Sequence, residues 1–504
     1  MAQFIQLDPK KLSVSHTIDA RLVSYNVEMT EVTGGTFWKS YTPAQIEGTE
    51  PFLVKGELSN FLSSGDLMQW YDPIDLYNPK LRYLAKSLGS AWVRVSGSWA
   101  TKTYYDFDGH TNGVIPEGFQ GILTKDQWIG VLEFVKHVNG KLLISVGNCS
   151  GNHPENGPLD LSQAELIFKF SKEYGVPIDA VEFMNEPNML ERSGAPQGYT
   201  SADFVRDQDI FNNWVRKNYP DCLVVGPCST DSDIMKMGDG KGGAGIADIF
   251  PTCPTEALLD GHTCTFDVFS YHYYNGVSER LESLAPAAHW NACDATSEEY
   301  LATAGACARG FVPFRDKYVP GGQMWVTESG DAGGGGNTWA STYLDVLRTL
   351  NEFGDFASVT DGVIFHNTLA SSDYGYLHHG SFDPRPNYFA AKLWNELMGS
   401  TVYKSEEPIR EGAHVYVHSR KDGKEGYVYL IINNSLTETT TVELPSDAMR
   451  YTLTGKVHMR STTMCLNGEE LLLDENGVLP RFTGILQPAG KTELLPGSCT
   501  FFVL

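Results

Sequence analysis

The sequence lacks any apolar run long enough to cross a membrane. A transmembrane helix needs about 18 or more consecutive apolar residues, and no hydrophobic run among the 504 residues approaches that length. The first residues, MAQFIQLDPKK, also lack the apolar core of a signal peptide. The sequence therefore predicts no membrane span and leaves two interpretations open, a cytosolic protein or a secreted protein whose leader has been removed.

Positive charge is scarce as well. Lys and Arg total 38 against 62 Asp and Glu, so the formal net charge is −24 at pH 7. A surface of this sign repels long polyanions, which argues against a nucleic-acid partner. Hydrophobic residues make up 41% and charged residues 20% of the chain, a composition typical of a globular protein with a large core.

The nine cysteines include no CxxC pair. We therefore expect no structural zinc site and no metal. Four cysteines lie in one loop-rich stretch, where disulfides are an open alternative: Cys253, Cys264, Cys293 and Cys307. Disulfides would favour an extracellular protein. Neither the cellular compartment nor the oligomeric state follows from the sequence.

Eight short apolar runs, rich in β-branched and aromatic residues, recur along the first 400 residues. Segments with helical period, such as PKLRYLAKSLG and KDQWIGVLEFVKHV, lie between them. Continuous apolar strands that alternate with helices predict an α/β fold of the (β/α)8 TIM barrel type. An open doubly wound sheet is the alternative, but no glycine-rich dinucleotide fingerprint follows an early strand. The runs begin at Leu22, Trp92, Lys141, Ala180, Cys222, Thr265, Gln323 and Gly362.

After about Ser400 the pattern changes to short segments with alternating polar and apolar residues, such as AHVYVHS and EGYVYLIINN. Period-two segments at short spacing predict a small antiparallel β-sandwich. We therefore predict three parts: an N-terminal strand in residues 1–17 that joins the sandwich, a catalytic barrel in residues 18–400, and the sandwich in residues 401–504.

Two glutamates each stand at the end of an apolar run: Glu186 in VEFMNEPN and Glu328 in MWVTES. Barrel active sites form at the carboxyl ends of the strands, so both side chains are predicted to face one pocket. Cleavage of a glycosidic bond needs one carboxyl that donates a proton and a second that stays ionised. The pair predicts a glycosidase, which retains anomeric configuration if the carboxyls lie about 5 Å apart and inverts it across a wider gap.

Several motifs carry a resemblance to a known family. They are NPKLRYLAKSLGSAWVRVSG near strand two, FMNEPN at strand four, YHYYNG at strand six, TESGDAGGGG at strand seven and YGYLHHGSFDPRPNYF after strand eight. With them the chain resembles glycoside hydrolase family 79 of clan A, which contains heparanase and β-glucuronidases. The resemblance implies a retaining enzyme without a cofactor, with Glu186 as acid/base and Glu328 as nucleophile.

The resemblance also implies roles for further residues. Arg94 and Tyr273 would keep Glu328 ionised, because a cation and a hydrogen-bond donor favour the charged form of a carboxyl. Asn185 would bind the sugar 2-hydroxyl, and Glu28 and Ser98 would contact the sugar. A second group would recognise the carboxylate of a uronic acid, namely Gly334, Gly335, Gly375 and Tyr376. His272 is interpreted as a hydrogen-bonded wall residue rather than a metal ligand.

The segment after strand one, residues 30–78, is long, and nothing like the excised segment of heparanase follows strand two. Such a segment would close one side of the site and favour an exo-acting β-glucuronidase that accepts one terminal sugar. Trp38, Trp70 and Trp99 are candidates for stacking on a sugar face or for packing. The alternatives are an endo-β-glucuronidase, a clan A hydrolase for a neutral sugar and a non-catalytic carbohydrate-binding protein. The aglycone stays open.

Overall fold

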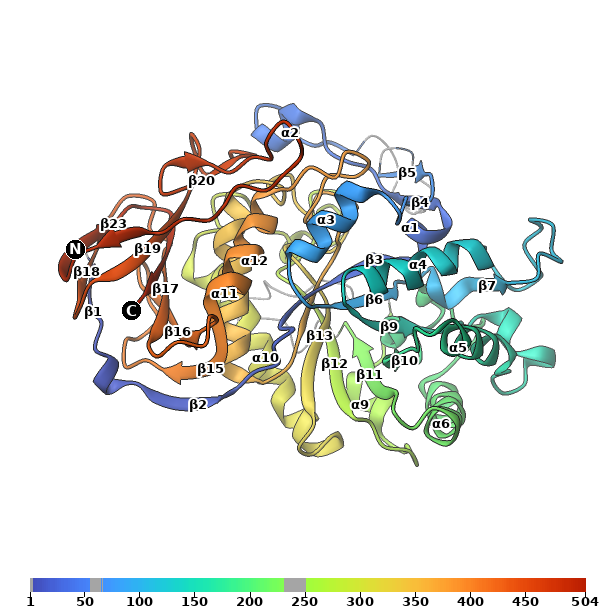
Figure 1. The fold of residues 1–504 in the computed structure, drawn as a ribbon. Coiled ribbons are helices and arrows are strands. Elements are labelled where there is room, and N and C mark those ends of the chain that lie inside the picture. Colours follow the sequence, from blue (N-terminus) through green and yellow to red (C-terminus); the bar gives the residue numbers. More distant parts are fainter. Residues whose placement is uncertain (1–2, 55–64, 66, 231–250) are drawn as a thin grey trace.

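The computed structural model describes residues 3–54, 65, 67–230 and 251–504. Eight parallel strands close into a barrel at its centre, in chain order around the ring (Figure 1). Each strand coincides largely with one of the eight apolar runs, so the predicted TIM barrel is confirmed. The strands are β3 (Val23–Glu28), β6 (Trp92–Ser96), β9 (Lys141–Ser145), β10 (Ala180–Glu182), β11 (Leu223–Ser229), β12 (Val268–Tyr274), β13 (Gln323–Gly330) and β14 (Ile364–His366).

The barrel strands are rich in apolar residues because both of their faces are buried. On β13, Met324 and Val326 join the large core between the strands and the helices, whereas Trp325 points into the barrel. Side chains that alternate along a strand thus meet apolar surroundings on either side. The barrel interior is filled at this level by Trp92, Leu143, Ala180, Val225, Val268, Trp325, Val363 and Phe365.

Helices form the outer layer of the barrel. Side-chain caps begin several of them, as in α4, where Thr124 accepts a hydrogen bond from the Gln127 N–H and the Gln127 side chain accepts from the Thr124 N–H. The helices are α3 (Pro79–Ser87), α4 (Lys125–His137), α5 (Ser162–Tyr174), α6 (Ser201–Asn218), α9 (Thr255–Leu259), α10 (Glu298–Tyr318), α11 (Leu344–Val359) and α12 (Pro386–Leu397).

Two β-sheets follow the barrel, and both include a strand from the N-terminus. In the larger sheet β2 pairs with β15, and in the smaller sheet β1 pairs with β18. The β1–β18 pairing is parallel, so the smaller sheet is not wholly antiparallel. The strands are β1 (Gln3–Gln6), β2 (Ser13–Thr17), β15 (Met398–Lys404), β16 (His414–Arg420), β17 (Tyr427–Asn433), β18 (Thr440–Leu444), β19 (Ala448–Gly455), β20 (Met464–Leu466), β21 (Glu469–Glu470), β22 (Ile485–Gln487), β23 (Gly490–Leu494) and β24 (Ser498–Val503).

Short elements in the loops surround the carboxyl end of the barrel. The segment after β3 contains α1 (Met29–Thr33), β4 (Gly35–Trp38), α2 (Pro43–Glu47) and β5 (Met68–Tyr71), with β4 and β5 paired antiparallel. The part of that segment at 55–64 and 66 lies outside the described residues. After β6 come β7 (Thr103–Asp106) and β8 (Gly121–Thr124), which pair in parallel, and after β10 comes the 3-10 helix η6 (Pro187–Ser193).

Two sequence expectations concern the chain as a whole. Among the described residues, no helix combines the length and the apolar character that a membrane crossing demands. None of the nine cysteines forms a disulfide, so the proposed bridges in the stretch from Cys253 to Cys307 are not formed in this structure.

Candidate active site

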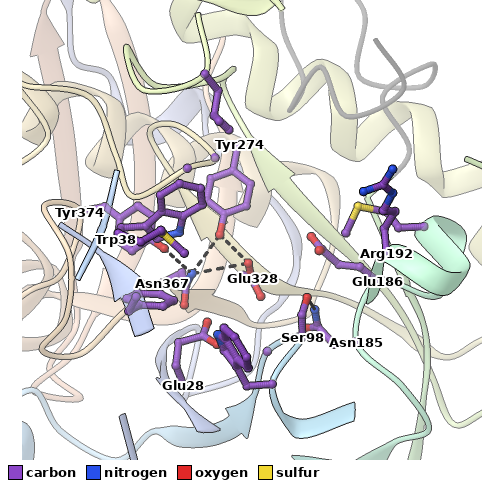
Figure 2. Close-up of a pocket in the computed structure, with 18 of the residues that line it drawn as sticks. Glu28, Trp38, Ser98, Asn185, Glu186, Arg192, Tyr274, Glu328, Asn367 and Tyr374 are labelled. Carbon is purple, nitrogen blue, oxygen red and sulfur yellow. Dashed lines mark hydrogen bonds between the residues drawn. The ribbon is translucent and has the colours of Figure 1, made fainter. Parts of the chain in front are cut away.

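Glu186 and Glu328 face each other at the carboxyl end of the barrel (Figure 2). Glu328 belongs to β13, and Glu186 follows β10 at the start of η6. A carboxylate oxygen of Glu186 lies within 4.8 Å of a carboxylate oxygen of Glu328. This separation is close to the 5–5.5 Å typical of retaining glycosidases and below the 6.5–9.5 Å of inverting ones.

Glu186 has a largely buried environment. Burial raises the pKa of its carboxyl to about 7, although the positive charge of Arg94 acts in the opposite direction. Its backbone is in the left-handed region at φ 45°, and its carbonyl accepts hydrogen bonds from the Met189 N–H and the Ser193 hydroxyl. Strained backbone held by neighbouring groups often marks a functional position. A carboxyl with this pKa can both donate and accept a proton near neutral pH.

Glu328 has donors on both carboxylate oxygens. Arg94 Nη1 lies 3.3 Å from its Oε2, and the Tyr274 hydroxyl donates to its Oε1 at 2.5 Å. Asn367 Nδ2 is 3.5 Å from the same Oε1. A cation and hydrogen-bond donors of this kind stabilise an ionised carboxylate.

Arg94 connects Glu328 and Asn185 to the barrel interior. The side chain is fully buried and donates from Nε to Glu182 Oε2 at 2.9 Å and from Nη2 to Asn185 Oδ1 at 2.8 Å. A buried guanidinium needs such partners, because its charge has lost its water. Arg94 therefore holds Glu328 and Asn185 in fixed positions.

His272 lies between the two catalytic candidates. Its Nε2 is 3.2 Å from Arg94 Nη2, which is always a donor, so Nε2 accepts and Nδ1 carries the proton. Nδ1 lies 3.1 Å from Glu186 Oε1 and 3.6 Å from Glu328 Oε2. Burial lowers the pKa of His272 to about 4, so the ring is neutral at neutral pH.

The cluster of Glu186, His272 and Glu328 also has the composition of a metal site, with ligand atoms within 4.8 Å of one another. A metal would have to displace the proton of His272 Nδ1 and would lie next to the Arg94 cation that already contacts Glu328. This donor set suits a hydrogen-bonded acid/base pair better than a divalent cation.

Glu28, Ser98 and Asn185, for which contacts with the sugar are predicted, line one wall of the pocket. Asn185 Nδ2 donates to Ser98 Oγ at 3.3 Å. Burial and the negative charge of Glu328 raise the pKa of Glu28 well above its usual value. At Gly97, φ is +90° and a Cβ would lie 1.7 Å from Glu28 Oε2, so this position needs glycine.

The opposite wall consists of the β4–β5 hairpin, the glycine-rich loop after β13 and the loop after β14. The hairpin contributes Phe37, Trp38 and Met68. The glycine-rich loop contributes Gly333 and Gly334, and the loop after β14 contributes Tyr374 (Figure 2). Of the other two tryptophans considered, Trp99 lines the pocket, whereas Trp70 does not and is 69% exposed.

The predicted hydrogen bond from Tyr273 to Glu328 is wrong. The Tyr273 hydroxyl bonds to Thr303 on α10 at 2.5 Å, and Tyr274 makes the contact with Glu328. Side chains alternate along a strand, so His272 and Tyr274 of β12 point into the barrel while Tyr273 points to the helices. Two consecutive residues could not both reach the site.

The predicted positions of Gly375 and Tyr376 in the pocket are also wrong. The Tyr376 ring is fully buried and stacks on His366 with centroids 3.9 Å apart. The Gly375 carbonyl accepts a hydrogen bond from Arg385. The residue of this loop that lines the pocket is Tyr374. Of the predicted glycines, Gly334 lines the pocket, whereas Gly335 packs against Trp38.

Sequence reasoning missed several pocket residues. Asn367 follows the β14 run, so the criterion that selected Glu186 and Glu328 would also have selected it. Alternation from His272 would have selected Tyr274. Lys102 and Arg192, two cations that line the pocket, carry no signal of this kind.

Comparisons with known proteins agree with this geometry. No protein-family model matches the chain. Heparanase-like protein 1 of Arabidopsis thaliana is 24% identical over 486 residues, which cover 86% of this chain and 85% of that protein. Baicalin-β-D-glucuronidase of Scutellaria baicalensis is 31% identical over 185 residues, or 35% of each chain.

A solved structure shares the fold. The crystal structure of a 4-O-α-L-rhamnosyl-β-D-glucuronidase from Fusarium oxysporum 12S has a TM-score of 0.62 and 13% identity, and the match covers 100% of both chains. These relatives carry heparanase-like and β-glucuronidase names, which supports the resemblance to glycoside hydrolase family 79, and the chain is a glycoside hydrolase.

Proposed function

We propose that the protein is a retaining exo-β-glucuronidase, which hydrolyses terminal β-linked glucuronic acid. The observation that carries the proposal is the approach of the Glu186 and Glu328 oxygens to within 4.8 Å of each other. Glu328 attacks the anomeric carbon while Glu186 gives its proton to the leaving oxygen. Glu186 then takes a proton from water, which attacks the same carbon and releases the sugar from Glu328.

Arg94, Tyr274 and Glu186 have matched roles in this scheme. Arg94 and Tyr274 hold Glu328 as an oriented carboxylate before the reaction. The raised pKa of Glu186 keeps it protonated when the glycosidic bond must break. Asn185, fixed by Arg94, stands on the sugar side and is proposed to bind the 2-hydroxyl, an interaction that strengthens in the transition state.

The proposed substrate is a glucuronide. Relatives of the chain carry the names heparanase-like protein and β-D-glucuronidase, and the glycine-rich loop presents backbone to the pocket. The N–H groups of consecutive glycines form concave sites that suit a carboxylate. The β4–β5 hairpin, which lines the pocket with Phe37, Trp38 and Met68, supports exo action on one terminal sugar.

An endo-β-glucuronidase is the second candidate, because two cations line the pocket, and one of them, Arg192, lies beside Glu186 (Figure 2). Lys102 and Arg192 are suited to an anionic group on the leaving side of a longer chain. A digest of a glucuronic acid-containing polysaccharide separates the two candidates. Exo action releases single glucuronic acid residues from the start, whereas early oligosaccharides would contradict it.

A panel of aryl β-glycosides tests the substrate class. We expect the glucuronide to be hydrolysed far faster than the glucoside, the xyloside and the galactoside. Preference for a neutral sugar would contradict the carboxylate assignment, and binding without turnover on every member would indicate a carbohydrate-binding protein.

Two variants test the roles of the carboxyls. Glu328→Ala is expected to abolish turnover of every aryl glucuronide, since the nucleophile is lost. Glu186→Ala should lower turnover least for leaving groups that need no proton, with a loss of the order of 10²–10⁴-fold for poor ones. Equal losses on good and poor leaving groups would contradict the role given to Glu186.

A further inference from the structure

The carbonyl groups of the glycine-rich loop, Gly333 to Gly336, all accept hydrogen bonds. The Gly333 carbonyl accepts from the Ser278 N–H, and the Gly334 carbonyl from Ser278 Oγ at 2.8 Å. The Gly335 carbonyl accepts from Ser372 Oγ and the Asp373 N–H. The loop is thus held through its oxygens from the segments after β12 and β14.

The N–H groups of the loop are used differently. Those of Gly333 and Gly336 donate to Gly276 and Ala332, but those of Gly334 and Gly335 have no partner among the described residues. In a trans peptide the N–H points opposite to the carbonyl. Because the Gly333 and Gly334 carbonyls point to Ser278, the N–H groups of Gly334 and Gly335 point away from it, and Gly334 lines the pocket.

Arg280 fixes this orientation. Its side chain is fully buried, and Nη1 donates to the Gly334 carbonyl at 3.2 Å and to the Gly336 carbonyl at 2.9 Å. A charged donor forms stronger hydrogen bonds than a neutral one, and the guanidinium holds two carbonyls in one geometry.

Arg280 also joins the other two segments of the wall. Nη2 donates to the Lys39 carbonyl at 2.6 Å and to Asp373 Oδ2 at 2.5 Å. The guanidinium lies 3.7 Å from the centre of the Tyr41 ring, and the Tyr41 hydroxyl donates to the Gly336 carbonyl. One side chain therefore connects the segment after β4, the glycine-rich loop and the loop after β14.

We propose that Arg280 is a positioning residue that sets the selectivity of the pocket for a carboxylate-bearing sugar. It does not line the pocket. It binds the Gly334 and Gly336 carbonyls from behind, so that the Gly334 and Gly335 N–H groups face the sugar carboxylate. The inference rests on the proposed glucuronidase function and identifies Arg280 as the residue that gives that function its selectivity for the carboxylate.

The test compares an aryl β-glucuronide with the matching aryl β-glucoside. In Arg280→Gln, kcat/KM for the glucuronide is expected to fall about 10- to 100-fold, the range of a lost charge-assisted hydrogen bond, mainly through KM. For the glucoside, kcat/KM should fall less than about fivefold, because this substrate has no carboxylate that the loop must bind. Arg280→Lys keeps the positive charge but lacks the planar guanidinium that binds two carbonyls at once. It should restore kcat/KM for the glucuronide only in part.

Ser278→Ala keeps the test informative if the Arg280 variants do not fold. It removes one of the donors to the Gly334 carbonyl, and the same selectivity should fall about two- to tenfold. Ser171→Ala is the matched control, since Ser171 is equally buried on α5 and bonds to Ile167 and Trp128 away from the pocket. It should leave the selectivity unchanged.

The outcomes separate the two proposals. A wild-type enzyme that fails to prefer the glucuronide contradicts the proposed function. The inference alone is overturned if the wild-type enzyme prefers the glucuronide but the Arg280 and Ser278 variants do not lose that preference. This is the case if kcat/KM falls equally for both substrates or if the preference is unchanged.

Discussion

At the scale of single residues, two carboxyls of the same chemical type have different neighbours, which suit them to different roles. Glu328 receives a guanidinium N–H and a phenol O–H. Glu186 receives the N–H of a neutral imidazole and is shielded from water, which raises its pKa to about 7. Burial and the charge of Glu328 also raise the pKa of Tyr274. The phenol therefore stays protonated and remains a hydrogen-bond donor to Glu328.

The first prediction concerns the pH dependence of the rate. Glu186 must be protonated to act as an acid, and its pKa is about 7. We expect kcat/KM for a glucuronide with a poor leaving group to fall as the pH rises through about 7, by tenfold per pH unit well above it. With a leaving group that needs no proton, this decline should disappear. A decline that is equal for both substrates would assign it to another group.

The second prediction concerns stability. The folded protein binds the Glu186 proton more tightly than the unfolded chain, because the pKa rises from 4.5 to about 7 on folding. The free energy of unfolding therefore decreases as the pH rises from about 4.5 to about 7, and the whole cost is present above 7. Glu186→Gln removes this cost and should stabilise the protein at pH 8 by up to about 3 kcal/mol.

Denaturant unfolding at two pH values checks this prediction. At pH 4 the carboxyl is neutral in both states, so Glu186→Gln should have little effect there. Glu117→Gln is the control, since Glu117 is exposed and its replacement should be neutral at both pH values. A stabilisation of Glu186→Gln that is equal at pH 4 and pH 8 would point to packing instead of charge.

At the scale of elements, the barrel and the two glutamates could be predicted because strand ends are visible in the sequence. A barrel strand reads as an apolar run, and the polar residue that ends it faces the pocket. An apolar run alone does not tell which of two consecutive residues faces the barrel interior. Because side chains alternate along β12, Tyr273 and Tyr274 point to opposite sides, and only Tyr274 reaches the site. The glycine-rich loop could be located but not oriented, because its orientation depends on Ser278, Arg280 and Asp373, which lie in other segments.

The third prediction uses the two neighbouring tyrosines of β12. Tyr274→Phe removes the hydroxyl that donates to Glu328, so kcat should fall about 10- to 100-fold. Tyr273→Phe is the matched control on the same strand, and it removes only the bond to Thr303. Its kcat should stay within about twofold, with a loss of stability of about 1 kcal/mol. Steady-state kinetics of both variants measure the difference, and an equal loss of kcat would contradict the assignment.

At the scale of the whole molecule, the barrel and the larger C-terminal sheet share one hydrophobic core. That core contains Phe353 of α11 together with Tyr416, Leu430 and Phe501 of the larger sheet. Polar contacts cross the same boundary, since Tyr343 Oη donates to carbonyls of the C-terminal part at 2.7 and 3.0 Å. The sheets therefore cover a helical face of the barrel that would otherwise be exposed to water (Figure 1).

The last prediction follows from this shared core. The protein should unfold by heat in one cooperative transition, with a calorimetric enthalpy equal to the van't Hoff enthalpy, although its length would permit two independent domains.

Asn351 on α11 lies at the boundary, where its Oδ1 accepts from Tyr416 Oη at 2.7 Å and contacts His414 Nδ1 at 2.7 Å. Asn351→Ala leaves the Tyr416 hydroxyl and His414 Nδ1 buried without these partners, and should lower the free energy of unfolding by about 2–4 kcal/mol. Asn213→Ala, at an exposed position of α6, should change it by less than about 0.5 kcal/mol. Two separate heat-absorption peaks, or an Asn351→Ala variant that shifts only one of them, would contradict a single folding unit, because a core that both parts complete cannot be lost in one part alone.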